Sequence, residues 1–263
     1  MDVRWDGEML GTRALVVGGS SGIGAATAAH FRAVGAEVLV ADINPPAADT
    51  TDFVHCDLRD PDSIDNLLKT VGSGWDVLAH VAGLPGTWPA LDVLNVNFLG
   101  MRRVVQGMLS RLNPGGSAVV VASTAGMLWQ HRTDVLDKLL AVDSVPALQA
   151  WIDAENTTYP VYNLSKEAAV LAVKRLAPQA WSDHQVRINT VSPGPVETPI
   201  LPDFEATMGK EFLDSVGAAV GRHARVEDIV PVIAFLSSPA AGWVIGQDIH
   251  VDGGFTSLVS SAR

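Results

Sequence analysis

The stretch that decides the fold is "VVGGSSGIGAAT", Val16 to Thr27, in which four glycines fall within seven residues. An apolar run precedes it and an alanine-rich stretch follows, an order typical of a strand, a glycine turn and a helix. Glycines at such a turn let the backbone approach a phosphate group, and a helix that starts there presents free N–H groups. A tight turn without a ligand has the same pattern, so the rest of the sequence must distinguish the two.

Short apolar runs alternate with helical patterns along the whole chain. Strands are predicted at residues 13–17, 36–42, 52–57, 75–83, 117–123, 185–194 and 247–254. A helix over 22–34 should end at Gly35, and another should start with Asp60 as its N-cap and Pro61 in its first turn. Several strands are continuous apolar runs, as in a parallel sheet covered on both faces. The sequence therefore predicts an α/β fold, a single Rossmann-type domain with a doubly wound parallel sheet of about seven strands.

Asp42 favours the phosphate-binding interpretation of the glycine turn. It ends the second predicted strand, 18 residues after Gly24 (42 − 24), near the roughly 20 residues expected for an acid that binds the adenosine ribose. A carboxylate there would repel a 2′-phosphate, and no Lys or Arg lies in the loop or just after Asp42. We therefore expect NAD(H) to be preferred over NADP(H). A Walker A loop is excluded because no Lys-Ser or Lys-Thr pair follows the glycines.

The overall composition excludes several other classes of protein. The 263 residues carry a net charge of −11, which argues against nucleic acid and anionic membranes as partners. No apolar run is long enough to span a bilayer. The single cysteine, Cys56, is expected to be a buried structural thiol in a reducing compartment. Because the first ten residues lack the apolar core of a signal peptide, we expect a cytoplasmic protein. The histidines show no metal-ligand spacing, so no metal site is predicted.

Tyr162 and Lys166 are the candidate proton-transfer pair. In "YNLSK" they are four residues apart, which places both side chains on one face of a helix. A neighbouring ammonium group and a nicotinamide cation would favour the phenolate of Tyr162. The phenol could then exchange a proton with an alcohol or ketone oxygen near neutral pH.

Six motifs together resemble the short-chain dehydrogenase/reductase family along nearly the whole chain. They occur in the family's order: "GGSSGIG", "NFLG", "VVVAST", "YNLSK", "INTVSPGPVETP" and "GQDIHVDGGF". The resemblance implies that Tyr162 is the general acid/base and that Lys166 lowers its pKa and binds the nicotinamide ribose. It also implies that Ser123 orients the substrate oxygen and that Asn97 anchors a water of the proton relay.

The same resemblance implies a set of cofactor contacts. Asp57 and Leu58 should contact adenine, Ala82 and Gly83 should flank the cofactor, and Val196 and Thr198 should lie near the carboxamide and pyrophosphate. The full implied cofactor set is Gly18, Ser20, Ser21, Gly22, Ile23, Gly24, Asp42, Asp57, Leu58, Ala82, Gly83, Tyr162, Lys166, Pro193, Val196 and Thr198.

Three features depart from the family pattern. Val17 stands where the family usually has Thr, and His80-Val81 stands where it usually has Asn-Asn. We interpret His80 as a structural histidine whose hydrogen bonds are satisfied. The third departure is a 39-residue separation between Ser123 and Tyr162 (162 − 123). This long separation indicates an insertion at about 127–160, which we expect to form two short helices interrupted by Pro146. Such an insertion resembles the bacterial 3α-hydroxysteroid dehydrogenase/carbonyl reductase branch.

These features predict an oxidoreductase that transfers a hydride between NAD(H) and a secondary alcohol or ketone. A cluster of apolar residues near the expected mouth favours an apolar, cyclic substrate such as a hydroxysteroid: Trp88, Met127, Leu128, Trp129, Trp151, Tyr159, Phe204 and Met208. An aryl or allylic alcohol of the coniferyl type is the alternative substrate, and a non-catalytic dinucleotide sensor is the alternative class. A mobile lid is expected as one helix over 201–212. The resemblance also implies a homodimer or homotetramer.

Overall fold

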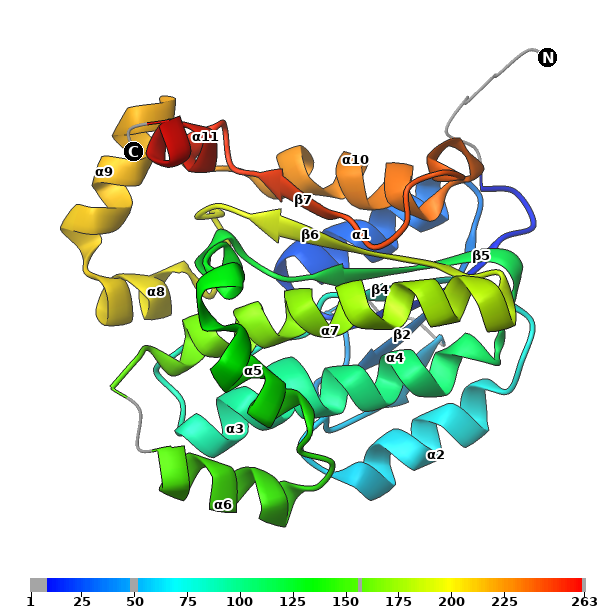
Figure 1. The fold of residues 1–263 in the computed structure, drawn as a ribbon. Coiled ribbons are helices and arrows are strands. Elements are labelled where there is room, and N and C mark those ends of the chain that lie inside the picture. The colour runs from blue at the N-terminus through cyan, green and yellow to red at the C-terminus, as the bar shows by residue number, and fades with distance from the viewer. Residues whose placement is uncertain (1–8, 48–51, 156–157, 262–263) are drawn as a thin grey trace.

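The computed structural model describes residues 9–47, 52–155 and 158–261, so the first eight of the ten residues expected not to form a signal peptide lie outside the described residues. Seven parallel strands form one sheet in the order β3-β2-β1-β4-β5-β6-β7 (Figure 1). Their bounds are β1 Arg13–Val17, β2 Glu37–Asp42, β3 Phe53–His55, β4 Trp75–His80, β5 Leu112–Val121, β6 Arg187–Pro193 and β7 Asp248–Val251. The strand order reverses between β1 and β4, which is where open α/β sheets bind their ligands.

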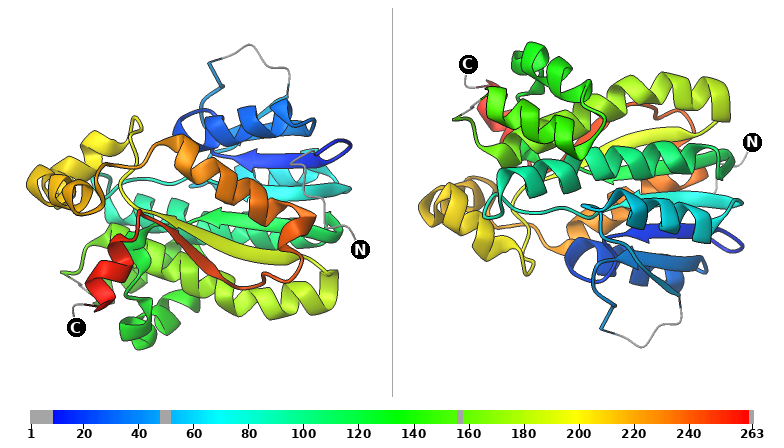
Figure 2. Two further views of the ribbon diagram at one scale, coloured as in Figure 1. Left: turned by 90° about the horizontal axis from the view of Figure 1, so that it is seen from above. Right: turned by 90° about the horizontal axis from the view of Figure 1, so that it is seen from below.

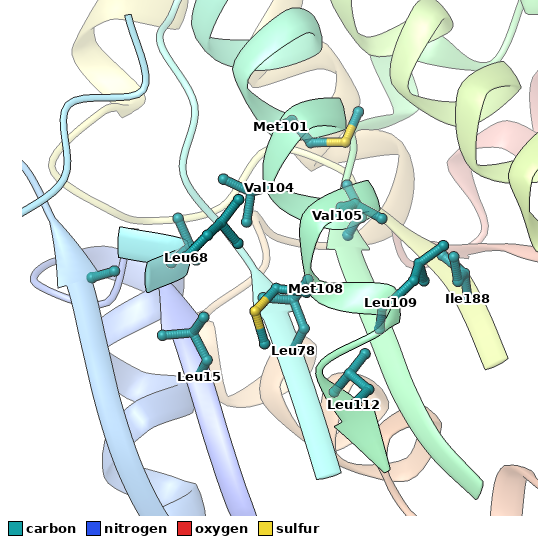
Figure 3. Close-up of a cluster of buried hydrophobic side chains, with 14 of the residues drawn as sticks. Leu15, Leu68, Leu78, Met101, Val104, Val105, Met108, Leu109, Leu112 and Ile188 are labelled. Carbon is teal, nitrogen blue, oxygen red and sulfur yellow. The ribbon is translucent and has the colours of Figure 1, made fainter. Parts of the chain in front are cut away.

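Helices connect the strands and cover both faces of the sheet. The main ones are α1 Gly22–Ala33, α2 Pro61–Val71, α3 Ala90–Leu94, α4 Met101–Leu109, α7 Val161–His184, α10 Val226–Ser237 and α11 Phe255–Ser261. Side chains alternate between the two faces along each strand and so divide the core into two clusters. One cluster lies against α2, α4 and α7, and the other against α1 and α10 (Figure 2). Met108, Leu78 and Leu15 belong to the first (Figure 3). The predicted single α/β domain is confirmed.

Local sequence signals placed several element ends correctly. β1 has the predicted bounds, and Gly35 follows α1 with a φ of +96°. Asp60 accepts a hydrogen bond from the amide of Asp62 at 2.9 Å and so caps α2. The expected lid helix is instead two helices, α8 Leu201–Met208 and α9 Lys210–Val220, which are separated at Gly209. The prediction of one helix over 201–212 was therefore wrong.

Residues 127–155 and 158–160, the described part of the predicted insertion, pack on the outside of α3 and α7 (Figure 1). They contain the short 3₁₀ helix η3 Trp129–Arg132 and the two expected helices, α5 Thr133–Leu140 and α6 Val145–Glu155. Pro146 is the second residue of α6, where its missing N–H costs no helical bond, and so it begins a helix instead of interrupting one. A third core cluster joins this segment to α3 and α7.

A π-helical turn, η1 Asn95–Gly100, lies between α3 and α4 and was not predicted. All six of its residues are buried. Turns of this kind are rare and occur frequently at functional sites. This one contains Asn97, which the family resemblance had already singled out.

Candidate active site

The glycine turn lies at the carboxyl end of β1, directly against the chain that follows β4. The amides of Val81 and Ala82 donate to the carbonyl of Val17 at 2.8 and 3.0 Å. Gly18 has a φ of +82°, and a Cβ at this position would clash with the backbone nitrogen of Ala82. The turn therefore requires glycine for its own packing, whether or not a ligand binds.

The amino end of α1 is suited to hold an anion. Ser21 precedes the helix but makes no capping bond with its side chain, and the first turn holds no acidic residue. Free N–H groups at the start of a helix, together with its dipole, attract phosphate groups. Gly22, Ile23 and Gly24 of this turn line a cleft of about 540 Å³. These residues fit the pyrophosphate of a dinucleotide cofactor.

Asp42 lies at the end of β2 on the same cleft. Its carboxylate accepts the amide of Ser20 at 3.0 Å and the amide of Asn44 at 3.1 Å. A carboxylate has about four acceptor positions, so capacity remains for further donors such as ribose hydroxyls. The hydroxyl of Ser20 donates to the carbonyl of Asn44 at 2.6 Å and so braces the loop after β2.

The end of the cleft that is expected to hold adenine contains an ion pair that sequence reasoning missed. Asp57 was expected to contact adenine, and it does line the cleft beside Leu58. Its carboxylate, however, accepts the guanidinium of Arg59, with 2.7 Å between Nη2 and Oδ2. This hydrogen bond lowers the pKa of Asp57. Arg59 also lines the cleft, and its spacing of two residues from Asp57 was the available signal.

Tyr162 and Lys166 lie on the first turns of α7, at the back of a second cavity of about 260 Å³. The Nζ of Lys166 is 5.7 Å from the centre of the Tyr162 ring and donates to the carbonyl of Val121 at 3.2 Å. Burial lowers the pKa of Lys166 to about 8. Burial also raises the pKa of Tyr162 to about 12, although a hydrogen bond with Ser123 opposes this. The expected lowering of the pKa of Tyr162 is therefore not produced by the protein alone, because desolvation dominates.

Asn97 is held rigidly behind these side chains. Its Oδ1 accepts the amide of Leu84 at 2.7 Å, and its Nδ2 donates to the carbonyl of Leu84 at 2.9 Å and to the hydroxyl of Ser165 at 3.0 Å. A Cβ at Gly83 would lie 3.3 Å from both the Oδ1 of Asn97 and the Nζ of Lys166. The predicted catalytic residues Asn97, Ser123, Tyr162 and Lys166 are therefore brought to one place.

The second cavity is lined mostly by apolar side chains. Of the residues expected near the mouth, Met127, Leu128, Phe204 and Met208 line it, joined by Phe212 and Phe255, which sequence reasoning missed. Trp129, Trp151 and Tyr159 instead pack against the third core cluster, and Trp88 lines the first cleft. The aromatic character of these residues did not show which of them pack in the core and which line a cavity.

Helix α8 closes over both cavities. The Phe204 ring is 4.9 Å from the Tyr162 ring, centre to centre. Asp203, one residue earlier, lines the first cleft and accepts the hydroxyl of Thr87 at 2.8 Å. This contact joins α8 to the loop after β4.

Most of the predicted cofactor set lines one of the two cavities, and two predicted site residues do not. The first cleft takes Gly18, Ser21, Gly22, Ile23, Gly24, Asp42, Asp57, Leu58, Ala82, Gly83 and Thr198, and the second takes Tyr162, Lys166, Pro193 and Val196. Ser20 and Asn97 lie one layer behind the lining, where each holds a residue that faces a cavity.

His80 differs from the interpretation given above. It ends β4, is 1% exposed and pairs in register with Val17. Neither ring nitrogen has a hydrogen-bond partner among the described residues, so the prediction of a satisfied histidine was wrong. Burial lowers the pKa of His80 to about 3, and the positive charge of Lys166 acts in the same direction. The two family departures, Val17 and His80, are therefore neighbours in the sheet.

Neither a metal cluster nor a membrane-spanning helix occurs in the part of the chain that the structure describes. Within residues 9–47, 52–155 and 158–261, no group of three or more His, Cys, Asp or Glu side chains could hold a metal ion. In the same residues no helix is long and apolar enough to cross a bilayer. Cys56 is buried, as expected, and burial raises its pKa to about 11.

Sequence comparison shows which known proteins this chain is similar to. A family model described as short chain dehydrogenase matches residues 12–133, and one described as Enoyl-(Acyl carrier protein) reductase matches residues 138–256. A coniferyl-alcohol dehydrogenase of a Pseudomonas species is 36% identical, over 95% of this chain and 98% of that protein. A 3-alpha-hydroxysteroid dehydrogenase/carbonyl reductase of Comamonas testosteroni is 31% identical, over 93% and 96%.

A solved structure gives the same relationship in three dimensions. The 3-alpha-hydroxysteroid dehydrogenase of Pseudomonas sp. B-0831, complexed with NADH, superposes with a TM-score of 0.83 and 28% identity, over 96% of this chain and 100% of that chain. The chain therefore belongs to the short-chain dehydrogenase/reductase family.

Proposed function

We propose that this protein is an NAD(H)-dependent oxidoreductase that interconverts a secondary alcohol and a ketone on an apolar, ring-containing substrate such as a hydroxysteroid. The observation that carries the proposal is the position of Tyr162 and Lys166. They line the cavity with apolar walls, which shares Gly83 with the cleft suited to a dinucleotide, and a Cβ at Gly83 would lie 3.3 Å from the Nζ of Lys166. Oxidation of an apolar alcohol needs both compartments and a proton acceptor between them.

In the proposed mechanism, the protein's own residues handle the proton and the substrate oxygen. Ser123 and Tyr162 hold that oxygen by hydrogen bonds, and Tyr162 takes up or returns the hydroxyl proton. Lys166, mostly protonated at neutral pH because its pKa is about 8, favours the phenolate. When bound, NAD would accept the hydride, and its positively charged ring would oppose the desolvation that raises the pKa of Tyr162. Asn97 keeps Leu84 in place at the junction.

Asp42 supports the preference for NAD(H) and leads to a testable expectation. Asp42→Asn keeps an acceptor for the loop amides but removes the negative charge that would repel a 2′-phosphate. We expect the ratio of the NADPH to the NADH dissociation constant to fall by about tenfold or more, or about 1.4 kcal/mol. Fluorescence titration with each reduced cofactor measures this ratio.

Asp57→Asn is the matched control, since Asp57 lines the same cleft but is paired with Arg59. It should change both dissociation constants by a similar factor. A wild-type protein that binds NADPH more tightly than NADH would contradict the assigned preference.

A substrate panel tests the proposed activity. Purified protein with NAD should oxidise hydroxysteroids such as androsterone, monitored by NADH absorbance. The relative at 36% identity favours a second candidate, an aryl or allylic alcohol, so coniferyl alcohol belongs in the same panel. Tight NADH binding without turnover of any alcohol or ketone would overturn the enzymatic proposal.

A further inference from the structure

The residue after Lys166 on α7 is a glutamate with no exposed surface. Glu167 is 0% exposed, and its carboxylate accepts the Nε of Arg132 at 3.1 and 3.0 Å and the hydroxyl of Tyr159 at 2.9 Å. The guanidinium of Arg132 also lies 3.3 Å from the centre of the Tyr159 ring. Both partners come from the Met127–Pro160 segment, so this cluster of three side chains ties the segment to the helix of Tyr162.

Burying this cluster has a cost in free energy, because it contains a carboxylate. A buried carboxylate is costly unless it is paired and hydrogen-bonded, and removing one partner leaves an uncompensated group. Burial raises the pKa of Glu167, whereas its bonds with Tyr159 and Arg132 lower it. The exposed pair of Asp137 on α5 and Arg175 on α7 joins the same two parts of the molecule without burial, since both side chains are about half exposed. Attachment of the Met127–Pro160 segment to α7 therefore does not by itself explain why Arg132, Tyr159 and Glu167 form a buried cluster.

The short chain between Ser123 and Arg132 connects the cluster to the substrate cavity. It starts at Ser123, at the end of β5, and runs along α7. A Cβ at Gly126 would lie 2.9 Å from the carbonyl carbon and oxygen of Lys166, so the chain lies flush against that turn. Met127 and Leu128, which come next, line the apolar cavity. Arg132 thus holds one end of this chain, and four cavity-lining residues lie between it and Ser123: Thr124, Ala125, Met127 and Leu128.

We propose that Arg132, Tyr159 and Glu167 are positioning residues for the substrate: they press Met127 and Leu128 against the catalytic helix and so set the fit of a large apolar alcohol. This inference rests on the proposed function, because it concerns the substrate cavity of that site. None of the three residues lines either cavity. The cluster should therefore affect which alcohols fit, and leave the proton transfer and the cofactor cleft unchanged.

The test compares two alcohols of different size in Glu167→Gln, which keeps the shape of the side chain but removes its charge. For androsterone, a large and rigid apolar alcohol, we expect KM to rise by about tenfold or more with a smaller change in kcat. For cyclohexanol, which is too small to need both Met127 and Leu128, KM should change by less than about twofold. Arg132→Lys, which keeps the charge but loses the planar fork, should give the same pattern more weakly. Asp137→Asn, the matched control, should change neither KM.

Hydrogen exchange provides a readout that does not depend on activity. In Glu167→Gln the amides of residues 125–132 should exchange about tenfold faster or more, while those of β5 and β6 stay as protected as in the wild type. Equal losses for both alcohols, or unchanged exchange over 125–132, would overturn the inference. A wild-type protein that oxidises no alcohol would defeat the proposed function instead, and the exchange measurement would still decide whether the cluster holds the segment.

Discussion

Tyr162→Phe is expected to lower turnover of the best alcohol by about 100- to 10,000-fold, the usual contribution of a positioned acid or base. The reason is that, among the described residues lining the second cavity, only Tyr162 and Lys166 have titratable side chains. Lys166 is held against the carbonyl of Val121, so no neighbouring group can replace the phenol. The measurement is kcat with NAD at saturating alcohol.

The variant should bind NADH as tightly as the wild type, within about twofold, since Tyr162 lines the second cavity and not the dinucleotide cleft. Its melting temperature, measured in parallel, identifies any loss of folded protein. Turnover close to that of the wild type would contradict the role assigned to Tyr162, and a matching loss of NADH binding would mean that the ring serves the cofactor instead.

Acidification from pH 7 to pH 5 is expected to reduce the free energy of unfolding by about 2 kcal/mol through His80 alone. The folded pKa is about 3 and the ordinary value is 6.5. The unfolded chain therefore takes up a proton below pH 6.5 that the folded protein refuses. Stability from this group is complete above pH 6.5 and declines by about 1.4 kcal/mol per pH unit until the folded pKa is reached.

His80→Leu isolates this contribution, because leucine fills a similar volume and does not titrate. Denaturant unfolding of both proteins at pH 7 and pH 5 should show the variant gaining about 2 kcal/mol relative to the wild type. His250 provides a control of opposite sign. Its hydrogen bond with Asp248 raises its pKa, so His250→Gln should lose stability relative to the wild type on acidification. If the wild type and His80→Leu differ in free energy of unfolding by the same amount at both pH values, the role assigned to His80 is contradicted.

The features predicted correctly from sequence depend on local chemistry. Gly35 ends α1 and Asp60 caps α2 because a left-handed residue or a short polar side chain acts on its own turn of backbone. Continuous apolar runs predicted the parallel sheet, since burial on both faces leaves no alternation. The spacing of Tyr162 and Lys166 placed them together because both lie on one helix.

The features that were missed depend on tertiary contacts between distant parts of the chain. The bond between Glu167 and Arg132 joins residues 35 positions apart, and nothing in either local sequence indicates a buried pair. His80 was expected to find a partner, but its neighbours in the register are Val17 and Val120, whose side chains offer none. Two further misses are local exceptions, for which the sequence held a signal: Gly209, which separates α8 from α9 with a φ of +87°, and the pairing of Asp57 with Arg59 two residues away.

The π turn η1 lies in one continuous run of helix from α3 to α4. It changes the direction in which the side chains after it point. Leu94 and Met101 are seven residues apart, a spacing that puts two side chains on the same side of a regular α-helix. Here Leu94 belongs to the third core cluster, which joins the predicted insertion to α3 and α7. Met101 belongs instead to the first core cluster, which lies against the sheet. Deleting one residue of the turn would rotate everything beyond it by about 100°. The π turn therefore sets both the direction in which the apolar stripe of α4 faces and the direction in which the side chain of Asn97 points. A change in the turn would change both.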